Sequence, residues 1–306
     1  MQGPTSRSFE VLRFSILDEC NFSCVYCVED VRRSAPDFVP ARILLSYVEK
    51  LLTQLKLKTI RITGGEPTLH PELLEIISGL RTMGVADIRM TTNGHTLSRV
   101  IDRAVQNGLG SVNISLDAVS KNAFATMSRV RDGEGVISGI DSSIALGIPV
   151  KLNCVVMRGL NDAEIVPLTQ FARERGIIIR FLEVMNMGPL YGKSHSFLMP
   201  ESEIVQRISE TEGYAERLIR DANSTTNYYR TRKGQIFGVI ANYSDPFCGD
   251  CNRLRLDSKG NVYGCLSSAS RENLAGADLN GLLDRALARK QNHFLGSETS
   301  MKAIGG

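Results

Sequence analysis

Residues 11–27 read VLRFSILDECNFSCVYC, a short apolar run followed at once by a loop with three cysteines. The apolar and β-branched residues of Val11–Leu17 predict a buried strand. The loop spaces Cys20, Cys24 and Cys27 as C-x3-C-x2-C. Thiols this close together at the end of a strand mark a first candidate site.

Strand-like runs alternate with amphipathic helical stretches up to about Glu183. The further strand-like runs are Thr59–Thr63, Asp87–Thr92, Val112–Leu116, Val150–Val156 and Ile177–Glu183. The helical stretches are Arg42–Leu57, Glu72–Met83, Leu97–Gly108, Val136–Leu146 and Ala163–Arg175. Repeated strand-helix units predict an α/β fold with parallel strands, either doubly wound or curled into a partial barrel. Both architectures bind ligands at the carboxyl ends of the strands.

The pattern changes after Gly188, so we predict a boundary between residues 1–188 and residues 189–306. The second part has the size of a small α+β region. Its expected elements are a helix at Met199–Glu212, strands within Tyr228–Tyr243, a hairpin turn at Asp257–Asn261 and a helix at Asn280–His293.

Composition limits the classes of function. The chain has 306 residues, of which 42% are hydrophobic and 23% charged, as in a globular protein with a full core. It has neither a run of about 18 apolar residues nor the apolar segment of a signal peptide, so we expect a cytoplasmic protein without a membrane span. With 36 Lys and Arg against 33 Asp and Glu, the net charge gives no reason to expect nucleic-acid binding.

The cysteines point to metal rather than to disulfides. The chain has seven cysteines, an odd number, and six of them fall into two tight groups in a sequence without an export signal. Cys20, Cys24 and Cys27 can hold three irons of a [4Fe–4S] cluster and leave the fourth iron open. A structural zinc ion would require a fourth protein ligand, and His70 and His95 fall on other loops.

A second group, Cys248, Cys251 and Cys265, has the spacing C-x2-C-x13-C. Again three thiols are in view, which fits a second [4Fe–4S] cluster with an open iron better than a zinc ribbon, although zinc stays an alternative. The remaining Cys154 lies in an apolar strand-like run, so we predict a buried core thiol there.

The first cysteine loop, together with Gly64-Gly65-Glu66-Pro67 after the second strand, resembles the radical S-adenosylmethionine (SAM) superfamily. The resemblance implies a (βα)6 partial TIM barrel, a [4Fe–4S] cluster whose open iron chelates SAM, and reductive cleavage of SAM to a 5′-deoxyadenosyl radical. We expect Asp117 to be the N-cap of the next helix rather than a ligand contact. The residues that the resemblance assigns to SAM binding are Gly64, Gly65, Glu66, Thr91, Asn93, Ser115 and Met185.

Residues 248–255 read CGDCNRLR, and the sequence ends in Ile304-Gly305-Gly306. Both stretches resemble the GTP 3′,8-cyclase (MoaA) family of molybdenum cofactor biosynthesis. The resemblance implies that the radical abstracts ribose H3′ of GTP, that the product is 3′,8-cyclo-7,8-dihydro-GTP, and that guanine N1 binds the second cluster. It also implies that the diglycine tail, Gly305 and Gly306, is catalytic and enters the active site.

Basic residues from several strands are the candidates for binding a nucleotide. Arg253 and Arg255 lie two positions apart and therefore share one face of a strand. A guanidinium group suits phosphate because it donates two parallel hydrogen bonds. The residues that the resemblance assigns to the substrate are Arg13, Arg61, Lys151, Arg180, Arg253 and Arg255.

The resemblance extends to partners and also has gaps. It implies a flavodoxin or ferredoxin as electron donor, a MoaC-type enzyme downstream and a homodimer. The sequence departs from the family pattern at Val28-Glu29, at Thr68-Leu69-His70 and at Thr59, where a basic residue is usual. Two alternatives therefore stay open: a related enzyme that cyclises or rearranges another nucleotide, and a zinc-stabilised binding module without catalytic activity.

Overall fold

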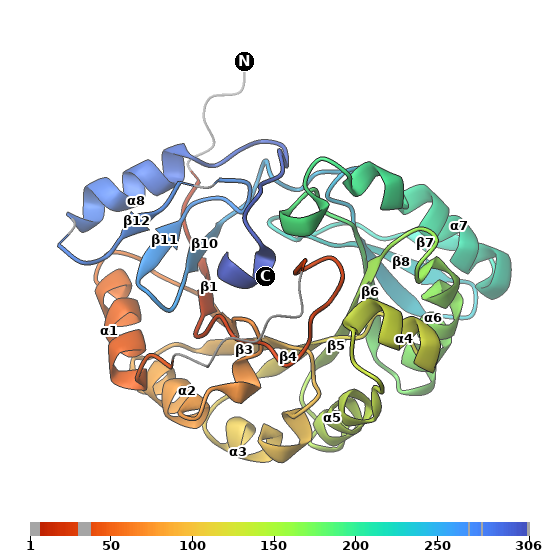
Figure 1. Cartoon of the computed structure of the whole chain (residues 1–306), viewed down its shortest axis with the longest axis horizontal. Coiled ribbons are helices and arrows are strands. Elements are labelled where there is room, and N and C mark those ends of the chain that lie inside the picture. The colour runs from red at the N-terminus through yellow and green to blue at the C-terminus, as the bar shows by residue number, and fades with distance from the viewer. Residues whose placement is uncertain (1–6, 30–37, 269, 277, 305–306) are drawn as a thin grey trace.

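A computed structural model of the chain shows an open barrel of strands with helices around its outside (Figure 1). The structure describes residues 7–29, 38–268, 270–276 and 278–304. The parallel barrel strands are β1 (Val11–Ser15), β2 (Thr59–Thr63), β3 (Asp87–Thr92), β4 (Ser111–Ser115), β5 (Val150–Val156) and β6 (Ile178–Glu183). The helices between and after them are α1 (Ala41–Leu52), α2 (Leu73–Thr82), α3 (Ile101–Gln106), α4 (Lys121–Ser128), α5 (Glu134–Ala145) and α6 (Ile165–Glu174).

Residues after Gly188 lengthen the same sheet at both of its edges. β10 pairs parallel with β1, and β9 pairs parallel with β6, which gives the order β12-β11-β10-β1-β2-β3-β4-β5-β6-β9-β8-β7. The later elements are α7 (Glu201–Glu212), β7 (Ala215–Arg217), β8 (Asn227–Thr231), β9 (Ile236–Ile240), β10 (Arg253–Leu256), β11 (Asn261–Tyr263), β12 (Glu272–Asn273) and α8 (Leu279–Ala288). The boundary expected at residue 188 stays a prediction, but no separate sheet follows it in the part that the structure describes.

Short 3-10 helices complete the chain, and one of them lies inside the barrel. They are η1 (Pro67–Leu69), η2 (Leu97–Arg99), η3 (Asp162–Glu164), η4 (Gly188–Leu190), η5 (Ser194–Phe197) and η6 (Met301–Ile304). Figure 1 shows η6, beside the C-terminus, within the ring of strands. Among the described residues, no helix has both the length and the apolar character needed to cross a bilayer.

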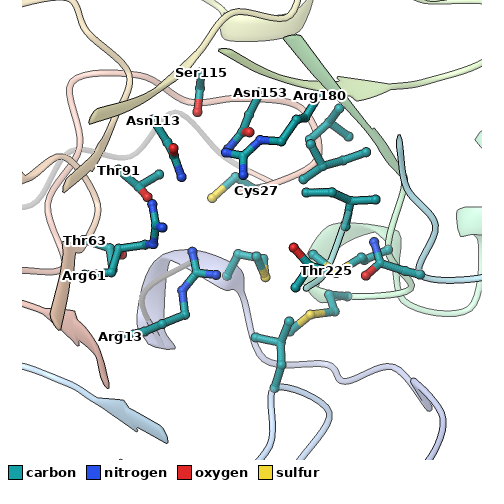
Figure 2. A pocket seen from close by; sticks show the side chains of 18 of the residues that line it. Arg13, Cys27, Arg61, Thr63, Thr91, Asn113, Ser115, Asn153, Arg180 and Thr225 are labelled. Atoms are coloured by element: carbon teal, nitrogen blue, oxygen red, sulfur yellow. The ribbon is translucent and has the colours of Figure 1, made fainter. Parts of the chain in front are cut away.

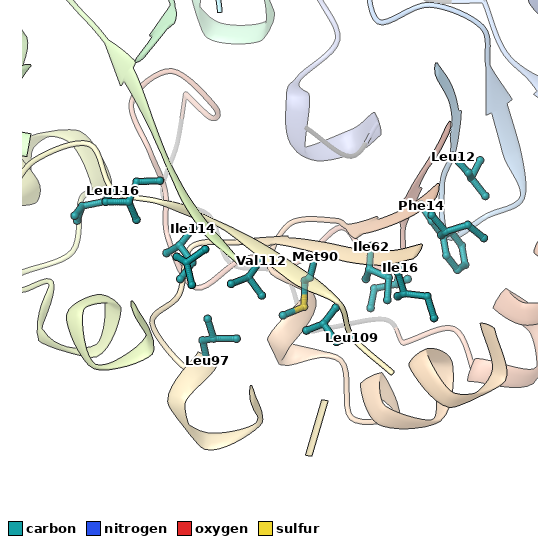
Figure 3. Close-up of a cluster of buried hydrophobic side chains, with 14 of the residues drawn as sticks. Leu12, Phe14, Ile16, Ile62, Met90, Leu97, Leu109, Val112, Ile114 and Leu116 are labelled. Atoms are coloured by element: carbon teal, nitrogen blue, oxygen red, sulfur yellow. The ribbon is translucent and has the colours of Figure 1, made fainter. Parts of the chain in front are cut away.

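Alternation along the barrel strands separates an outer core from an inner cavity. On β5, Leu152, Cys154 and Val156 are at most 1% exposed and belong to the hydrophobic core, part of which is shown in Figure 3. Lys151 and Asn153 alternate with them along the strand and line the inner cavity. The prediction that Cys154 is a buried core thiol is confirmed. The period of two thus decides which residues of each strand can contact a ligand.

Some predicted element bounds are wrong, and tertiary contacts explain the errors. Helix α1 ends at Leu52 rather than at Leu57, because the chain leaves the helix to reach β2. Leu55 and Leu57 still pack against the core, from a loop, so their apolar character reflects burial and not helical periodicity. Helix α8 ends at Ala288 rather than at His293.

The stretch 97–108, predicted as one helix, divides into η2 and α3. Helix α5 lies directly against this turn: a Cβ atom on Gly139 would lie 2.4 Å from the carbonyl oxygen of Gly94. Helix α4 was not predicted at all, because its sequence, KNAFATMS, buries only Phe124, Met127 and Ser128.

Candidate functional site

A cavity of about 520 Å³ lies inside the barrel and is lined by residues from the carboxyl ends of its strands. Figure 2 shows side chains from several strands converging on it. Both cysteine groups border this one space. The predicted site residues that line it are Arg13, Cys20, Cys24, Cys27, Arg61, Gly64, Gly65, Thr91, Asn93, Ser115, Lys151, Arg180, Met185, Cys248, Cys251, Arg253, Arg255 and Cys265.

The first cysteine loop is held by its neighbours on both sides. Cys20 Sγ accepts hydrogen bonds from the backbone N–H of Phe22 at 3.4 Å and from Asn93 Nδ2 at 3.7 Å. The backbone N–H groups of Ser23 and Val25 donate to carbonyls at the end of α4, at 3.2 and 3.0 Å. Helix α4, which was not predicted from the sequence, therefore holds the predicted cysteine loop in place.

The thiols of this loop suit a cluster with its own positive charge. Burial raises the pKa of Cys20 to about 12 and the pKa of Cys24 well above its ordinary value. Iron deprotonates such thiols when it binds them. In the described part of the chain, no three His, Cys, Asp or Glu side chains converge on a point that could hold one metal ion. A cubane does not need this convergence, because each thiolate binds a different iron.

The two glycines after β2 let two loops approach closely. A Cβ atom on Gly65 would lie 2.0 Å from the carbonyl oxygen of Glu19, and one on Gly64 would lie 2.6 Å from that of Leu17. The Gly65 N–H donates to the Leu17 carbonyl at 2.9 Å. Glycine is therefore required at both positions because the chain packs against the base of the cysteine loop. Both residues also border the cavity.

Glu66, unlike Gly64 and Gly65, is not among the described residues that line the cavity, and its contact with SAM stays a prediction. Its carboxylate is fully buried and accepts hydrogen bonds from Thr68, from Thr92 Oγ1 at 2.6 Å and from the Asn93 N–H at 2.6 Å. Burial raises the pKa of Glu66, and these hydrogen bonds oppose that rise. The carboxylate joins the ends of β2 and β3, a geometry that favours a supporting role over direct contact with the amino group of SAM.

Asp117 is not the N-cap that the sequence suggested. The N-cap position of α4 belongs to Ser120. Asp117 instead accepts a hydrogen bond from Tyr26 Oη at 2.8 Å and one from the Val155 N–H at 2.8 Å. The first of these bonds connects the cysteine loop to the barrel wall. The expectation failed because Tyr26 and Asp117 are distant in sequence.

Four arginines stand side by side on adjacent strands and line the cavity. Arg13 of β1 is in register with Arg255 of β10 and with Arg61 of β2, and Arg61 is in register with Arg89 of β3. Arg253 faces the same cavity from β10, as strand alternation predicts. This row of guanidinium groups lines one side of the cavity wall.

Burial makes this positive charge costly without an anion. Desolvation and the guanidinium groups of Arg180 and Arg89 lower the pKa of Arg61 to about 9. Desolvation and Arg253 lower the pKa of Arg255 to about 10. Within the described residues, Arg61 Nη1 and Arg180 Nε and Nη2 are buried without a hydrogen-bond partner. Such groups indicate a site built for a strongly anionic ligand.

The second cysteine group carries a pair of cations of its own. Cys251 Sγ accepts hydrogen bonds from Arg253 Nε at 3.3 Å and from Lys290 Nζ at 3.3 Å. Burial raises the pKa of Cys251, but the charges of Arg253 and Lys290 outweigh this effect and lower the pKa to about 6. The Arg253 guanidinium also stacks on the Phe247 ring, with its carbon 4.9 Å from the ring centre.

The C-terminal segment reaches into the barrel. Ser300 Oγ donates to the Cys27 carbonyl at 2.7 Å, and Arg255 Nη1 donates to the Ile304 carbonyl at 3.4 Å. Ile304 is 2% exposed. Gly305 and Gly306, expected to be catalytic, lie outside the described residues.

Sequence reasoning missed several residues of the site. Arg89 has a detectable signal, because it lies two positions before Thr91 and so shares its face of β3. Lys290 and Tyr228 have no comparable signal in the sequence. Tyr228 Oη accepts a hydrogen bond from Lys151 Nζ at 3.1 Å, a pairing between strands distant in sequence.

Comparison with known proteins agrees with this geometry. A profile of the radical SAM superfamily matches residues 14–172, and a profile described as Molybdenum Cofactor Synthesis C matches residues 177–295. A GTP 3′,8-cyclase from Staphylococcus carnosus is 35% identical, covering 86% of this chain and 80% of that protein. One from Corynebacterium glutamicum is 34% identical, covering 96% of this chain and 86% of that protein.

Solved structures share the fold. SuiB of Streptococcus suis bound to SAM matches with a TM-score of 0.66 and 12% identity, covering 94% of this chain and 67% of SuiB. The native anSMEcpe structure with bound SAM matches with a TM-score of 0.62 and 15% identity, covering 90% of this chain and 80% of that one. The chain therefore belongs to the radical SAM superfamily, whose members carry a [4Fe–4S] cluster and SAM, and within it to the GTP 3′,8-cyclase family.

Proposed function

We propose that the chain converts GTP to 3′,8-cyclo-7,8-dihydro-GTP in molybdenum cofactor biosynthesis. The observation that carries the proposal is that two cysteine triads and seven cationic side chains border one cavity of about 520 Å³. A radical enzyme for a nucleoside triphosphate needs both features in one enclosed space. The names of the relatives, GTP 3′,8-cyclases, supply the substrate of the proposal.

At one side of the cavity, Cys20, Cys24 and Cys27 would hold the first cluster. When bound, this [4Fe–4S] cluster supplies the electron that cleaves SAM to the radical that attacks the substrate. Asn93 keeps Cys20 in place through its amide, 3.7 Å from the sulfur. Ser115, on the cavity wall, would orient the SAM ribose.

At the other side, Cys248, Cys251 and Cys265 would hold a second [4Fe–4S] cluster that binds the purine. The row of arginines on β10, β1 and β2 would hold the phosphates, because each guanidinium can donate two parallel hydrogen bonds to an anion. Bound phosphate would also offset the repulsion that lowers the pKa of Arg61. The two cysteine groups lie far apart in the sequence, the first on the loop after β1 and the second on the segments before β10 and after β11, which supports separate roles for them.

Several partners complete the proposal. A flavodoxin or ferredoxin would deliver the electron, and a MoaC-type enzyme would take the cyclised product. A homodimer is the proposed assembly. Titration of the reduced donor against the enzyme and measurement of the molecular mass in solution test these two points.

One observation favours a different nucleotide as a second candidate substrate. The Thr59 hydroxyl, where the family usually has a basic residue, donates to Asp87 Oδ2 at 2.7 Å, and Asp87 also pairs with Arg89 at 2.6 Å. The β3 end of the arginine row therefore has less free positive charge than the rest of the row. A ligand with fewer phosphates would suit it.

The decisive experiment incubates the reduced, reconstituted enzyme with SAM and each nucleoside mono-, di- and triphosphate under anaerobic conditions. We expect mass spectrometry to detect a cyclised product with GTP. Product from another nucleotide alone would replace GTP as the substrate, and a protein that holds zinc and leaves SAM intact would overturn the enzymatic proposal. Iron analysis should give about eight irons per chain for two cubanes.

Two cysteine variants separate the roles of the clusters. Cys24→Ala should abolish 5′-deoxyadenosine formation, because the first cluster loses a ligand. Cys251→Ala should reduce cyclised product far more than SAM cleavage. Equal losses of both activities in Cys251→Ala would contradict the proposed division of labour.

A further inference from the structure

Lys290 lies just beyond α8 and uses all three of its N–H donors on the second cysteine group. Its Nζ atom lies 3.3 Å from Cys251 Sγ, 2.8 Å from the Arg253 carbonyl oxygen and 3.0 Å from the Gly264 carbonyl oxygen. Arg253 follows Cys251 by two residues, and Gly264 immediately precedes Cys265. One ammonium group thus joins the two backbone segments that carry Cys251 and Cys265.

A close contact between α8 and the cysteine hairpin allows this reach. A Cβ atom on Gly264 would lie 1.8 Å from the carbonyl oxygen of Ala286 on α8, so only glycine permits the helix to lie so near. Ala286 is 1% exposed, and the Lys290 ammonium lies 5.1 Å from the centre of the buried Phe9 ring. The packing of α8 therefore fixes where Lys290 can place its charge.

The surroundings of this charge favour an anionic partner at the cysteines. Among the described residues, no carboxylate lies within the 4.0 Å of an ion pair with Lys290, and its acceptors are the sulfur and two carbonyls. A shielded ammonium group requires compensation, and the thiolate of Cys251 is the acceptor that can carry a full negative charge.

We propose that Lys290 is a positioning residue of the second metal site, where its ammonium fixes Cys251 and the two carbonyls so that the triad can hold a [4Fe–4S] cluster. This inference rests on the proposed second cluster. Hydrogen bonds to cluster sulfurs and nearby positive charge stabilise the more negative, reduced state. Lys290 therefore raises the reduction potential of this cluster as well as its retention.

The test uses the full chain with Cys20, Cys24 and Cys27 all changed to Ala, so that iron can bind only at the second triad. In this parent we compare Lys290→Met, which removes the charge at similar length, with Lys290→Arg, which keeps it. Arg289→Met is the matched control, because the neighbouring Arg289 pairs with Glu272 at 2.7 Å and does not contact the cysteines. The measurements are iron release to a chelator and the midpoint potential followed by electron paramagnetic resonance.

We expect Lys290→Met to retain iron about 10–100-fold less well than the parent, the usual effect of losing a residue that supports metal ligands. Its midpoint potential should fall, while Lys290→Arg and Arg289→Met stay close to the parent. Equal retention and potential in Lys290→Met and the parent would overturn the role of Lys290 and leave the second cluster intact as a proposal.

Two further outcomes are informative. A parent that binds zinc or no iron would overturn the second cluster itself and the role of Lys290 with it. Where Lys290→Met does not fold, Lys290→Gln replaces it, since glutamine keeps hydrogen-bond donors without the charge. A potential below that of the parent in this variant supports the proposal, and an unchanged potential contradicts it.

Discussion

At the scale of single residues, the hydrogen bond between Tyr26 and Asp117 connects the radical-forming loop to the barrel. Both side chains line the cavity, and the acceptor carboxylate is 7% exposed. Without the phenol, Asp117 Oδ2 would lose its partner in a buried place. We expect Tyr26→Phe to lower the free energy of unfolding by about 1–3 kcal/mol.

A double-mutant cycle with Asp117→Asn tests whether this effect arises from the pair. When Asp117→Asn is already present, Tyr26→Phe should cost much less, because the charged acceptor has been removed. Urea unfolding of the iron-free protein measures all four forms. Additive effects would mean that Tyr26 stabilises the fold through packing alone.

The same carboxyl group gives a prediction for pH. Burial raises the pKa of Asp117 from 3.8 to about 6, against the hydrogen bonds from Tyr26 and Val155. Between these values the folded protein binds more protons at this site than the unfolded chain does, so stability falls as pH rises. The free energy of unfolding of wild type relative to Asp117→Asn should therefore fall by about 3 kcal/mol between pH 3 and pH 7. A flat difference over this range would contradict the assignment.

The residue scale also shows what sequence can and cannot reveal about the site. The first cysteine triad and Gly64-Gly65 were found because close spacing in sequence reflects one loop, and the second triad because a hairpin returns Cys265 to Cys248 and Cys251. Arg13 and Arg61 entered through family resemblance, and their register across β1 and β2 became visible only in the sheet. Lys290 could not be found, because its contacts with Cys251 depend on how α8 packs.

At the scale of elements, the strands were predictable and the helix ends were not. The predicted bounds of β2, β3 and β5 agree with the structure. Successive residues of a strand point to opposite faces of the sheet, and this gives the sequence a recognisable period of two. The end of α8 depends instead on the turn that carries Lys290 toward the Gly264 carbonyl. The residue at which this helix ends therefore depends on contacts with residues distant in sequence and not on the local sequence pattern.

Glu183 at the end of β6 links three elements and predicts a stability effect at this scale. It accepts hydrogen bonds from the first N–H of α7, on Glu201, at 2.8 Å and from the N–H groups of Tyr243 and Ser244 at 2.7 and 3.0 Å. The N-cap residue of α7, Pro200, supplies no side-chain cap. Glu183→Leu would leave these donors without partners, and we expect a loss of about 3 kcal/mol or more in urea unfolding.

Glu183→Gln is the matched variant, because its amide oxygen can still accept some of these hydrogen bonds. Its loss should be clearly smaller than that of Glu183→Leu. Similar losses in both variants would show that charge, rather than the number of accepted hydrogen bonds, stabilises this junction.

At the scale of the whole molecule, the C-terminal segment enters the barrel and contacts the first cysteine loop and Arg255. Ser297 exchanges backbone hydrogen bonds of 3.0 Å with Asn186 and Gly188 after β6, and Ser300 bonds to the Cys27 carbonyl at 2.7 Å. Beyond it, Arg255 bonds to the carbonyl of Ile304. Figure 1 shows η6 inside the ring of strands. The family resemblance implied that the tail enters the active site, but the contacts of this segment could not be predicted from sequence, because it has little regular structure.

Removing this segment should uncouple SAM cleavage from substrate turnover. A chain that stops after Phe294 keeps all six cluster cysteines but loses the contacts at Cys27 and Arg255, so the radical is less well confined to the substrate and can be lost in side reactions with other hydrogen donors. We expect unchanged iron content and an increased ratio of 5′-deoxyadenosine to cyclised product. A chain that stops after Ile304 keeps the segment and loses only Gly305-Gly306, so it should bind iron normally while turnover falls. If both truncations lower cleavage and product in proportion, the segment supports the first cluster and does not enclose the reaction.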